Sequence, residues 1–504
     1  RDNIDAFGGG VRVLRTLDWQ RLEVRSPISR ITEIAHLDAV RWIEPAAPPR
    51  IEHNATAASR VKADVLYDAP YVVDGYPVTV GIWDGGAVDA HPDFGSRLTV
   101  YDPVGIGSHG THVAGTIGGS GVGNPAAKGM APSVQLQSYD WNSDAAEMRN
   151  AATSRSVVIS NHSYGFITGW HWNGLAWIDW GNDGFGLYDS YAQEYDDVVF
   201  DTGLLVFKSA GNDRNDGPDC PSVCDGPYDS IGHVGNAKNI LTICALTDSD
   251  AMTSFSSWGP SNDGRIKPDL CANGYQLTST LPGGSYGPST GTSMSSPSAA
   301  GTAALLFEHF QNQFATDPSP ETLKTLMIHG ANDLGRQGPD YEFGWGIIDA
   351  EITADLISSE SFVEGSIAGT GDQQEYTFEV ITASPIKLTL GWTDPAGEPL
   401  AARALVNNLD LLLIDPNGIP HYPWTLDPDS PSNPATKGIN IVDNMEQVAV
   451  NVPEAGTWTA RVSGFSVPLG PQLFTLVASS LAEAVPSAPS APSASDGTYP
   501  DKVQ

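Results

Sequence analysis

Short apolar runs separated by amphipathic stretches dominate the chain after residue 53. Four runs, rich in β-branched and other apolar residues, have the length of buried strands: 78–83, 157–160, 204–207 and 240–243. Helix-compatible segments lie between them, at 144–152 and 188–199. Strands that alternate with helices need crossover connections, which place parallel strands in a sheet covered on both faces. The pattern predicts one α/β domain over residues 53–355.

After about residue 360 the apolar positions alternate with a period of two. The expected strands are short and are separated by turns such as Asp-Pro and Pro-Asn-Gly: 375–380, 386–390, 410–414, 447–452 and 457–462. This pattern is typical of an all-β sandwich, here over residues 360–482. Residues 483–504 contain Pro-Ser-Ala repeats that cannot bury a core, so we expect a linker there.

Composition excludes several classes of protein. With 26 Lys and Arg against 60 Asp and Glu, the net charge is −34, which would repel the phosphates of nucleic acid. No apolar run approaches the roughly 20 residues that cross a bilayer, so no membrane span is expected. With 40% hydrophobic residues, 53 glycines and 37 prolines, the chain is expected to fold with many turns.

The four cysteines fall into two pairs with different surroundings. Cys220 and Cys224 flank a short polar segment and can close a small bridge, which favours an oxidising compartment. Cys244 and Cys271 lie in apolar, strand-like segments, where we expect buried free thiols.

Three motifs supply an acid, a base and a nucleophile. Asp84 directly follows a buried strand, His109 lies in residues 108–115 (SHGTHVAG), and Ser293 lies in residues 291–297 (GTSMSSP) before a helix of small residues. A serine hydroxyl becomes a good nucleophile when an imidazole takes its proton and a buried carboxylate fixes that imidazole. The order Asp, His, Ser differs from that of α/β-hydrolases.

These motifs resemble those of the subtilisin-like serine peptidases (subtilases), over most of residues 53–355. The resemblance implies a subtilisin-like parallel sheet flanked by helices, a catalytic triad of Asp84, His109 and Ser293, and an acyl-enzyme mechanism on polypeptide substrates that needs no cofactor. Residues 209–212 (SAGN) resemble the oxyanion-hole segment, with Asn212 as donor. The implied substrate-binding residues are Ser163, Tyr164, Gly165, Ala210 and Gly211.

Resemblance extends beyond the α/β domain. Residues 408–411, 415–418 and 467–472 are similar to the jelly-roll or P-like β-sandwich of the alkaline, oxidation-resistant subtilases. Residues 1–52 resemble the remnant of a subtilase propeptide, which implies a zymogen inhibited by its own propeptide and cut near residues 50–54. The alternative is an ordinary extra strand and helix on the domain surface. The family implies a secreted or cell-surface protein.

Several residues leave alternatives open. Gly85 stands where the family usually has Ser or Thr, which removes a donor to Asp84. Asp213, beside Asn212, either favours a basic substrate residue or is a solvated charge. His112 is expected to be structural. The tryptophans at 170, 172, 177 and 180 either form a platform for substrate or cover the core of an insertion.

A structural Ca²⁺ is the one cofactor that the sequence suggests. Its candidate ligands are carboxylates near turns of the sandwich: Asp394, Asp410, Asp415 and Asp443. In so acidic a chain these groups are alternatively solvated surface charges. Two rival functions also stay open: an inactive subtilase-like protein, and a surface-binding protein led by the sandwich.

Overall fold

The computed structural model describes residues 11–16, 22–37, 40, 53–181, 184–220, 222–381 and 384–479. It divides the chain into two compact units, Arg1–Ile51 and Glu52–Gln504. In the first unit, strand β1 (Arg12–Thr16) pairs antiparallel with β2 (Leu22–Arg25), and the 3-10 turn η1 (Ile28–Arg30) leads into helix α2 (Ile31–Ala35). Val11 and Ile34 are buried there.

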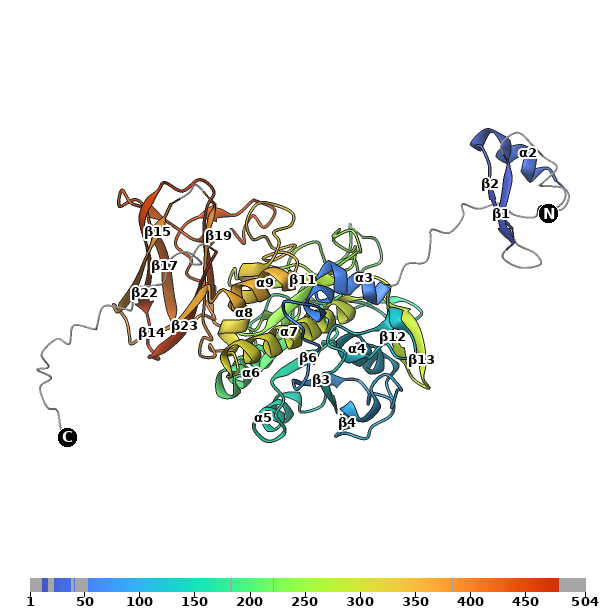
Figure 1. The fold of residues 1–504 in the computed structure, drawn as a ribbon, viewed down its shortest axis with the longest axis horizontal. Helices are drawn as coiled ribbons and strands as arrows, with labels where there is room; N and C mark the ends of the chain where they lie inside the picture. The colour runs from blue at the N-terminus through green and yellow to red at the C-terminus, as the bar shows by residue number, and fades with distance from the viewer. Residues whose placement is uncertain are drawn as a thin grey trace, which may run out of the picture. The chain divides into compact units, whose positions relative to one another are not determined.

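A seven-stranded parallel sheet forms the centre of the second unit (Figure 1). Its strands in spatial order are β11 (Leu270–Asn273), β10 (Leu241–Leu246), β9 (Leu205–Ser209), β6 (Ile159–His162), β3 (Thr79–Asp84), β5 (Gln135–Asp140) and β4 (Leu98–Val100). The strands expected from the apolar runs are all members of this sheet. The predicted parallel α/β architecture is therefore confirmed.

Helices cover both faces of the sheet because its strands are apolar on both sides. On β3, Val80 and Ile82 pack in one cluster with α4 (Ser108–Gly118) and α7 (Thr292–Phe314). Trp83 belongs to a second cluster, with α5 (Asp144–Arg155) and α6 (Ser190–Thr202). The remaining helical segments are α3 (His53–Arg60), η2 (Asp64–Tyr67), η3 (Gly95–Arg97), η4 (Pro125–Ala127), η5 (His233–Asn236), α8 (Pro320–Gly330) and α9 (Ala350–Ser358).

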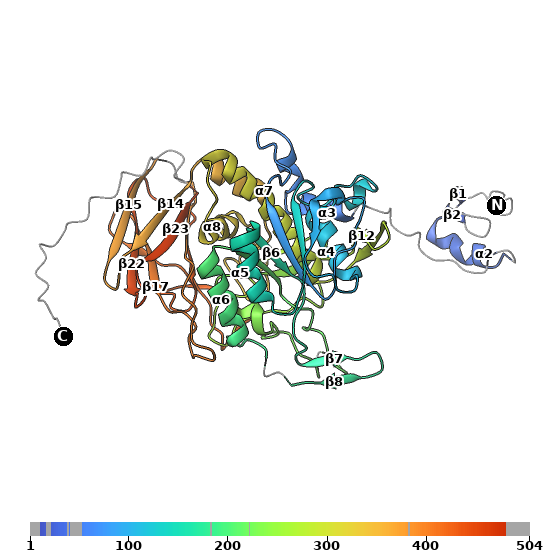
Figure 2. The ribbon, with the colours of Figure 1, turned by 90° about the horizontal axis from the view of Figure 1, so that it is seen from below.

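Two hairpins extend from this domain. Strands β7 (Trp170–Trp172) and β8 (Trp177–Asp179) form one, which projects away from the sheet (Figure 2). Strands β12 (Leu277–Leu281) and β13 (Ser285–Ser289) form the other, against α4.

The C-terminal region consists of antiparallel sheets, as predicted. One sheet has the order β14 (Phe362–Ile367), β23 (Gln472–Ala478), β16 (Ile386–Gly391) and β21 (Met445–Val450). The other has the order β15 (Gln373–Val380), β22 (Gly456–Ser466), β17 (Asn408–Ile414) and β18 (Pro420–His421). The short strands β19 (Trp424–Thr425) and β20 (Thr436–Lys437) pair separately. Helix α8 packs against β16 and β23, which joins the sandwich to the α/β domain.

Both cysteine pairs form disulfides. The Cys220–Cys224 bridge was expected, but free thiols at Cys244 and Cys271 were not, and that prediction is wrong. Strands β10 and β11 are parallel neighbours, with Cys244 in register with Cys271 and their Cα atoms 4.5 Å apart. The pairing depends on strand register, which the apolar pattern of each strand alone does not specify.

Candidate active site

The carboxyl ends of three adjacent strands carry most of the expected site residues. Strand β3 ends at Asp84, β6 leads into residues 163–165, and β9 leads into residues 210–212. In the sheet, β6 lies between β3 and β9, and all three run parallel. Parallel strands end at the same edge, which is where open α/β sheets bind ligands.

Asp84 and His109 are in direct contact. Asp84 is almost fully buried, and His109 is the second residue of α4. His109 Nδ1 lies 3.0 Å from Asp84 Oδ1 and 2.8 Å from Oδ2, while the Gly85 N–H donates to Oδ1 at 2.9 Å. Because Nδ1 donates to the carboxylate, Nε2 is left as the basic nitrogen. The protein around the ring lowers the pKa of His109, but the hydrogen bond and charge of Asp84 outweigh this and leave that pKa raised.

Ser293 lies in the first turn of α7, directly behind Gly291 and Thr292. Its Oγ donates to the Ser163 carbonyl at 3.1 Å, and Ser163 Oγ donates back to the Ser293 carbonyl at 3.1 Å. Within the described residues no hydrogen bond joins Ser293 Oγ to His109. The hydroxyl is bonded here to the Ser163 carbonyl rather than to the imidazole, and catalytic hydrogen bonds of this kind often tighten only with substrate.

Helices α4 and α7 start at the same edge of the sheet and pack closely along their length. A methyl group on Gly301 of α7 would lie only 2.9 Å from the Ile117 carbonyl oxygen of α4. The first turn of α4 contacts Asp84, and that of α7 contacts Ser163. The packing of these two helices thus fixes where His109 and Ser293 lie relative to the strand ends.

Asn212 is held by the residue that precedes Ser293. Its Oδ1 accepts from the Thr292 N–H at 2.9 Å and from Thr292 Oγ1 at 3.0 Å. Its Nδ2 has no hydrogen-bond partner among the described residues and is free to donate. The Ser293 N–H is in the first helical turn, where N–H groups lack an intrahelical acceptor. The site therefore offers two donors beside Ser293 Oγ, as an oxyanion hole requires.

The structure explains why glycine follows Asp84. A methyl group on Gly85 would lie 2.7 Å from the ring of Trp141, so a larger residue would require that ring to move. Trp141 is half exposed, and its ring centroid lies 5.7 Å from that of Tyr164. The Gly85 backbone N–H, which a Ser or Thr would also have, still donates to Asp84, and the additional side-chain donor is absent. Trp141 was missed in the sequence because only the fold brings it to Gly85.

His112 and Asp213 both contact protein groups. His112 Nε2 lies 2.9 Å from the Leu277 carbonyl and 3.1 Å from that of Gly287, and burial lowers the pKa of His112 to about 4. A neutral His112 thus anchors the β12–β13 hairpin. Asp213 Oδ2 accepts from Ser257 Oγ at 3.3 Å, and burial raises the pKa of Asp213 to about 6.

The tryptophan hairpin does not enclose a core. Trp172 and Trp177 meet edge to face, with centroids 5.6 Å apart, but Trp172 is 49% and Trp180 is 64% exposed. Such exposure argues against the tryptophans as the cover of a buried insertion. A platform for substrate stays a prediction.

The calcium candidates have different surroundings. Asp394 binds Lys238 Nζ and accepts from the backbone N–H groups of Val406 and Asn407, so its oxygens are occupied. Asp443 accepts from Ile266 N and Asn440 Nδ2, and Asp415 accepts from backbone N–H groups of its own turn. In the described part of the chain no group of three or more His, Cys, Asp or Glu side chains is placed to hold a metal. Asp394 and Asp443 thus accept hydrogen bonds from protein groups, and their role as Ca²⁺ ligands stays a prediction.

Asp410 differs from these three carboxylates, because its Oδ1 is buried and has no hydrogen-bond partner in the part of the chain that the structure describes. The same is true of both amide atoms of Asn408 on β17 and of Oε1 of Glu446 on β21. Glu446 Oε2 accepts from the Leu411 N–H at 2.7 Å, so the Glu446 side chain reaches β17 at the residue next to Asp410 in the sequence. Burial raises the pKa of Asp410 to about 6.

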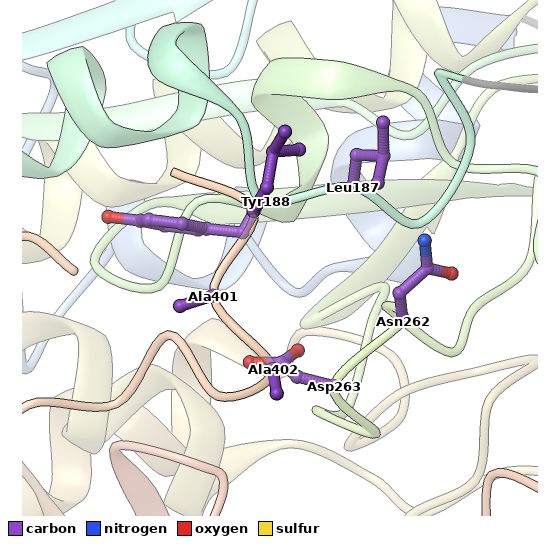
Figure 3. A pocket seen from close by; sticks show the side chains of 7 residues that line it. Leu187, Tyr188, Asn262, Asp263, Ala401 and Ala402 are labelled. Atoms are coloured by element: carbon purple, nitrogen blue, oxygen red, sulfur yellow. The ribbon is translucent and has the colours of Figure 1, made fainter. Parts of the chain in front are cut away.

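A cavity of about 230 Å³ lies away from the strand ends (Figure 3). It is lined by Leu187, Tyr188, Asn262, Asp263, Leu400, Ala401 and Ala402. Its carboxylate, Asp263, is bound to Arg265 and to the Ala404 N–H. None of the expected catalytic residues lines this cavity, which belongs to the contact between the α/β domain and the sandwich.

Comparison with known proteins gives one consistent result. A model of the Subtilase family matches residues 75–346, more than half of the chain. Subtilisin E of Bacillus subtilis (strain 168) is 29% identical over 267 residues, covering 49% of this chain and 59% of that protein. Subtilisin of Bacillus pumilus is 29% identical over 318 residues, covering 59% of this chain and 97% of that protein.

Among solved structures, a lanthipeptide protease is 21% identical with a TM-score of 0.44, covering 61% of this chain and 95% of that one. The patellamide maturation protease PatA is 23% identical with a TM-score of 0.44, covering 56% of this chain and 96% of that one.

Proposed function

This chain belongs to the subtilase family, and from that premise we propose that it is a secreted serine endopeptidase that cleaves polypeptides through an acyl-enzyme on Ser293. The observation that carries the proposal is the arrangement at one edge of the sheet. There Asp84 binds His109, and Asn212 Nδ2, which has no partner within the described ranges, lies beside Ser293.

The proposed mechanism begins with a rotation of Ser293. Its Oγ leaves the Ser163 carbonyl and donates to His109 Nε2, which takes the proton as Oγ attacks the substrate carbonyl carbon. Asn212 Nδ2 and the Ser293 N–H stabilise the oxyanion of the tetrahedral intermediate. His109 then protonates the leaving amine as the C–N bond breaks, and water hydrolyses the ester by the same steps. Asp84 keeps the His109 tautomer and stabilises its charged form.

The strand after β6 is proposed to pair with the substrate backbone. Rotation of Ser293 frees the Ser163 carbonyl as an acceptor, and Gly165 is exposed beside it. Backbone hydrogen bonds to an added strand provide affinity without selecting side chains. Ala210 and Gly211 lie on the opposite side, next to Asn212.

Secretion is proposed on the two disulfides, since such bonds persist in oxidising compartments. Within the described residues no helix has both the length and the apolarity to cross a bilayer.

The expected propeptide cut near residues 50–54 begins outside the described residues, and Asn54 lies in α3. The separate unit Arg1–Ile51 supports a propeptide that inhibits the enzyme until it is cut.

Structural calcium is proposed at the edge of β17. Asn408, Asp410 and Glu446 supply buried oxygens that have no partner among the described residues, and hard oxygen ligands are what Ca²⁺ prefers. The ion would balance carboxylates that otherwise repel each other. It takes no part in the proposed chemistry.

A fluorophosphonate probe tests the proposed activity, because it reacts only with an activated serine. We expect wild-type protein to be labelled and Ser293→Ala to remain unlabelled. Absence of labelling in folded, fully processed wild type would favour the rivals, an inactive subtilase or a surface-binding protein.

N-terminal sequencing of wild type and Ser293→Ala tests the propeptide, since autocatalytic cutting near residue 50 should occur only in the wild type.

A further inference from the structure

Four lysines are buried among the described residues: Lys208, Lys238, Lys267 and Lys324. Three of them bind carboxylates. Lys238 pairs with Asp394, and both Lys267 and Lys324 pair with Asp269. A buried ammonium normally needs such a partner, because removing a charge from water is costly.

Lys208 has no carboxylate partner within the described part of the chain. Its Nζ donates to three neutral oxygens, the Tyr164 carbonyl, the Ser209 carbonyl and Ser209 Oγ. Only 5% of this residue is exposed, and burial lowers the pKa of Lys208 to about 8. The proposed mechanism makes no use of this cation.

Lys208 lies between the two segments that flank the proposed cleavage point. It belongs to β9, just before Asn212, and its Nζ reaches across to Tyr164, just after the Ser163 carbonyl that holds Ser293 Oγ. The carbonyl carbon under attack must lie at Ser293 Oγ, with its oxygen at Asn212 Nδ2. This carbonyl belongs to the substrate residue called P1. Its side chain is attached to the neighbouring Cα and therefore lies beside these two segments.

Open space adjoins the ammonium. Gly165 is exposed, and a methyl group on it would meet only Lys208 Nζ, at 3.9 Å. The carboxylate of Asp213 packs against Gly211, since a methyl group on Gly211 would lie 2.6 Å from Asp213 Oδ2. The same carboxylate accepts a hydrogen bond from Ser257 Oγ. Lys208 is thus the charged group that borders the open side of Gly165.

We propose that Lys208 is a specificity-determining residue that selects substrates with Glu or Asp at P1. The P1 carboxylate would pair with Nζ, which releases Ser209 Oγ, a rotatable hydroxyl 3.2 Å away. A charged acceptor makes a stronger hydrogen bond than the neutral hydroxyl it replaces. A basic P1 residue, which Asp213 alone would suggest, would bring two cations together. This inference rests on the proposed peptidase activity.

Matched peptides that differ only at P1 test the inference. The substrates carry Glu, Gln, Leu or Lys, and kcat/KM is measured for wild type, Lys208→Met and Lys208→Arg. In the wild type we expect Glu to exceed Gln by at least about tenfold, the size of one charge-assisted hydrogen bond. Lys208→Met should bring that ratio to one or below while Gln and Leu cleavage change little, and Lys208→Arg should retain a preference for Glu.

Two results would overturn the inference. One is a wild type that cuts after Gln, Leu or Lys at least as well as after Glu, which needs no variant to fold. The other is a Lys208→Met enzyme in which all four substrates lose the same factor, as expected of a lysine that only ties β9 to Tyr164. Fluorophosphonate labelling separates the two proposals, because labelled enzyme without a Glu preference refutes this inference alone, and unlabelled enzyme refutes the peptidase.

Discussion

The contact between the two large domains buries its polar groups, whereas the edge of the parallel sheet leaves His109 and Asn212 exposed. At the domain contact, Lys238 Nζ binds Asp394 and the carbonyls of Pro395 and Ala404, and Asp394 accepts two further N–H groups. At the sheet edge, His109 Nε2 and Asn212 Nδ2 have no partner within the described residues. Polar groups whose hydrogen bonds are all made within the protein stabilise the contact between the domains. Polar groups without a protein partner are available to bind a substrate.

The largest expected effect is a loss of kcat that distinguishes His109 from His112, which lie on the same helix, α4. His109→Ala removes the proposed base and should lower kcat by about 10⁶-fold, the magnitude known for loss of the base of a subtilisin. His112→Gln is the control, because the hydrogen bonds of the His112 ring within the described residues go to the β12–β13 hairpin. It should lower the melting temperature and leave kcat within about tenfold. A larger loss of kcat in His112→Gln than in His109→Ala would contradict the assignment.

Next in size is the loss of the oxyanion donor. Asn212→Leu should reduce kcat by about 10²- to 10³-fold, the magnitude measured for the equivalent donor in subtilisin. Thr292→Val removes one of the two hydrogen bonds that orient Asn212 and keeps the amide. Its effect on kcat should be about tenfold or less. Equal losses in the two variants would show that Asn212 has only a structural role.

The pH dependence of kcat/KM is a smaller effect. Activity should rise as His109 loses its proton, with a midpoint above the ordinary imidazole value of about 6.5, since Asp84 raises the pKa of His109. Below the midpoint the rate should fall about tenfold per pH unit. Asp84→Asn should move the midpoint down, because the burial that lowers the pKa remains. A midpoint unchanged in Asp84→Asn would exclude this cause.

Calcium removal should have the smallest effect. If Ca²⁺ binds the folded sandwich, EDTA should lower the melting temperature by several degrees, at about 2–4 °C per kcal/mol of lost binding. Asp410→Asn should abolish the response to Ca²⁺, whereas the exposed Asp429→Asn should keep it. Melting that is identical with EDTA and with Ca²⁺ would refute the site.

Local patterns predict the architecture and the motifs, but not the contacts between distant segments. The apolar runs locate the central strands, because a buried parallel strand is apolar on both faces. Asp84, His109 and Ser293 each lie in a short distinctive motif at a strand end or helix start. In contrast, Lys208 directly follows an apolar run, and one of its acceptors, the Tyr164 carbonyl, comes from another strand end. The Lys238–Asp394 pair joins residues 156 positions apart, so Asp394 resembled a surface carboxylate in the sequence.

The most direct test compares kcat and the free energy of unfolding of two aspartate variants. Asp84 and Asp394 are both buried, but only Asp84 lies at the sheet edge. Asp84→Asn should lower kcat by about 10⁴-fold and leave the free energy of unfolding nearly unchanged. Asp394→Asn should lower the free energy of unfolding by about 3–5 kcal/mol, because Lys238 loses its partner, and leave kcat of the folded enzyme nearly unchanged. Both quantities are measured on both variants. Wild-type kcat in Asp84→Asn, or a loss of kcat without a loss of stability in Asp394→Asn, would contradict the account.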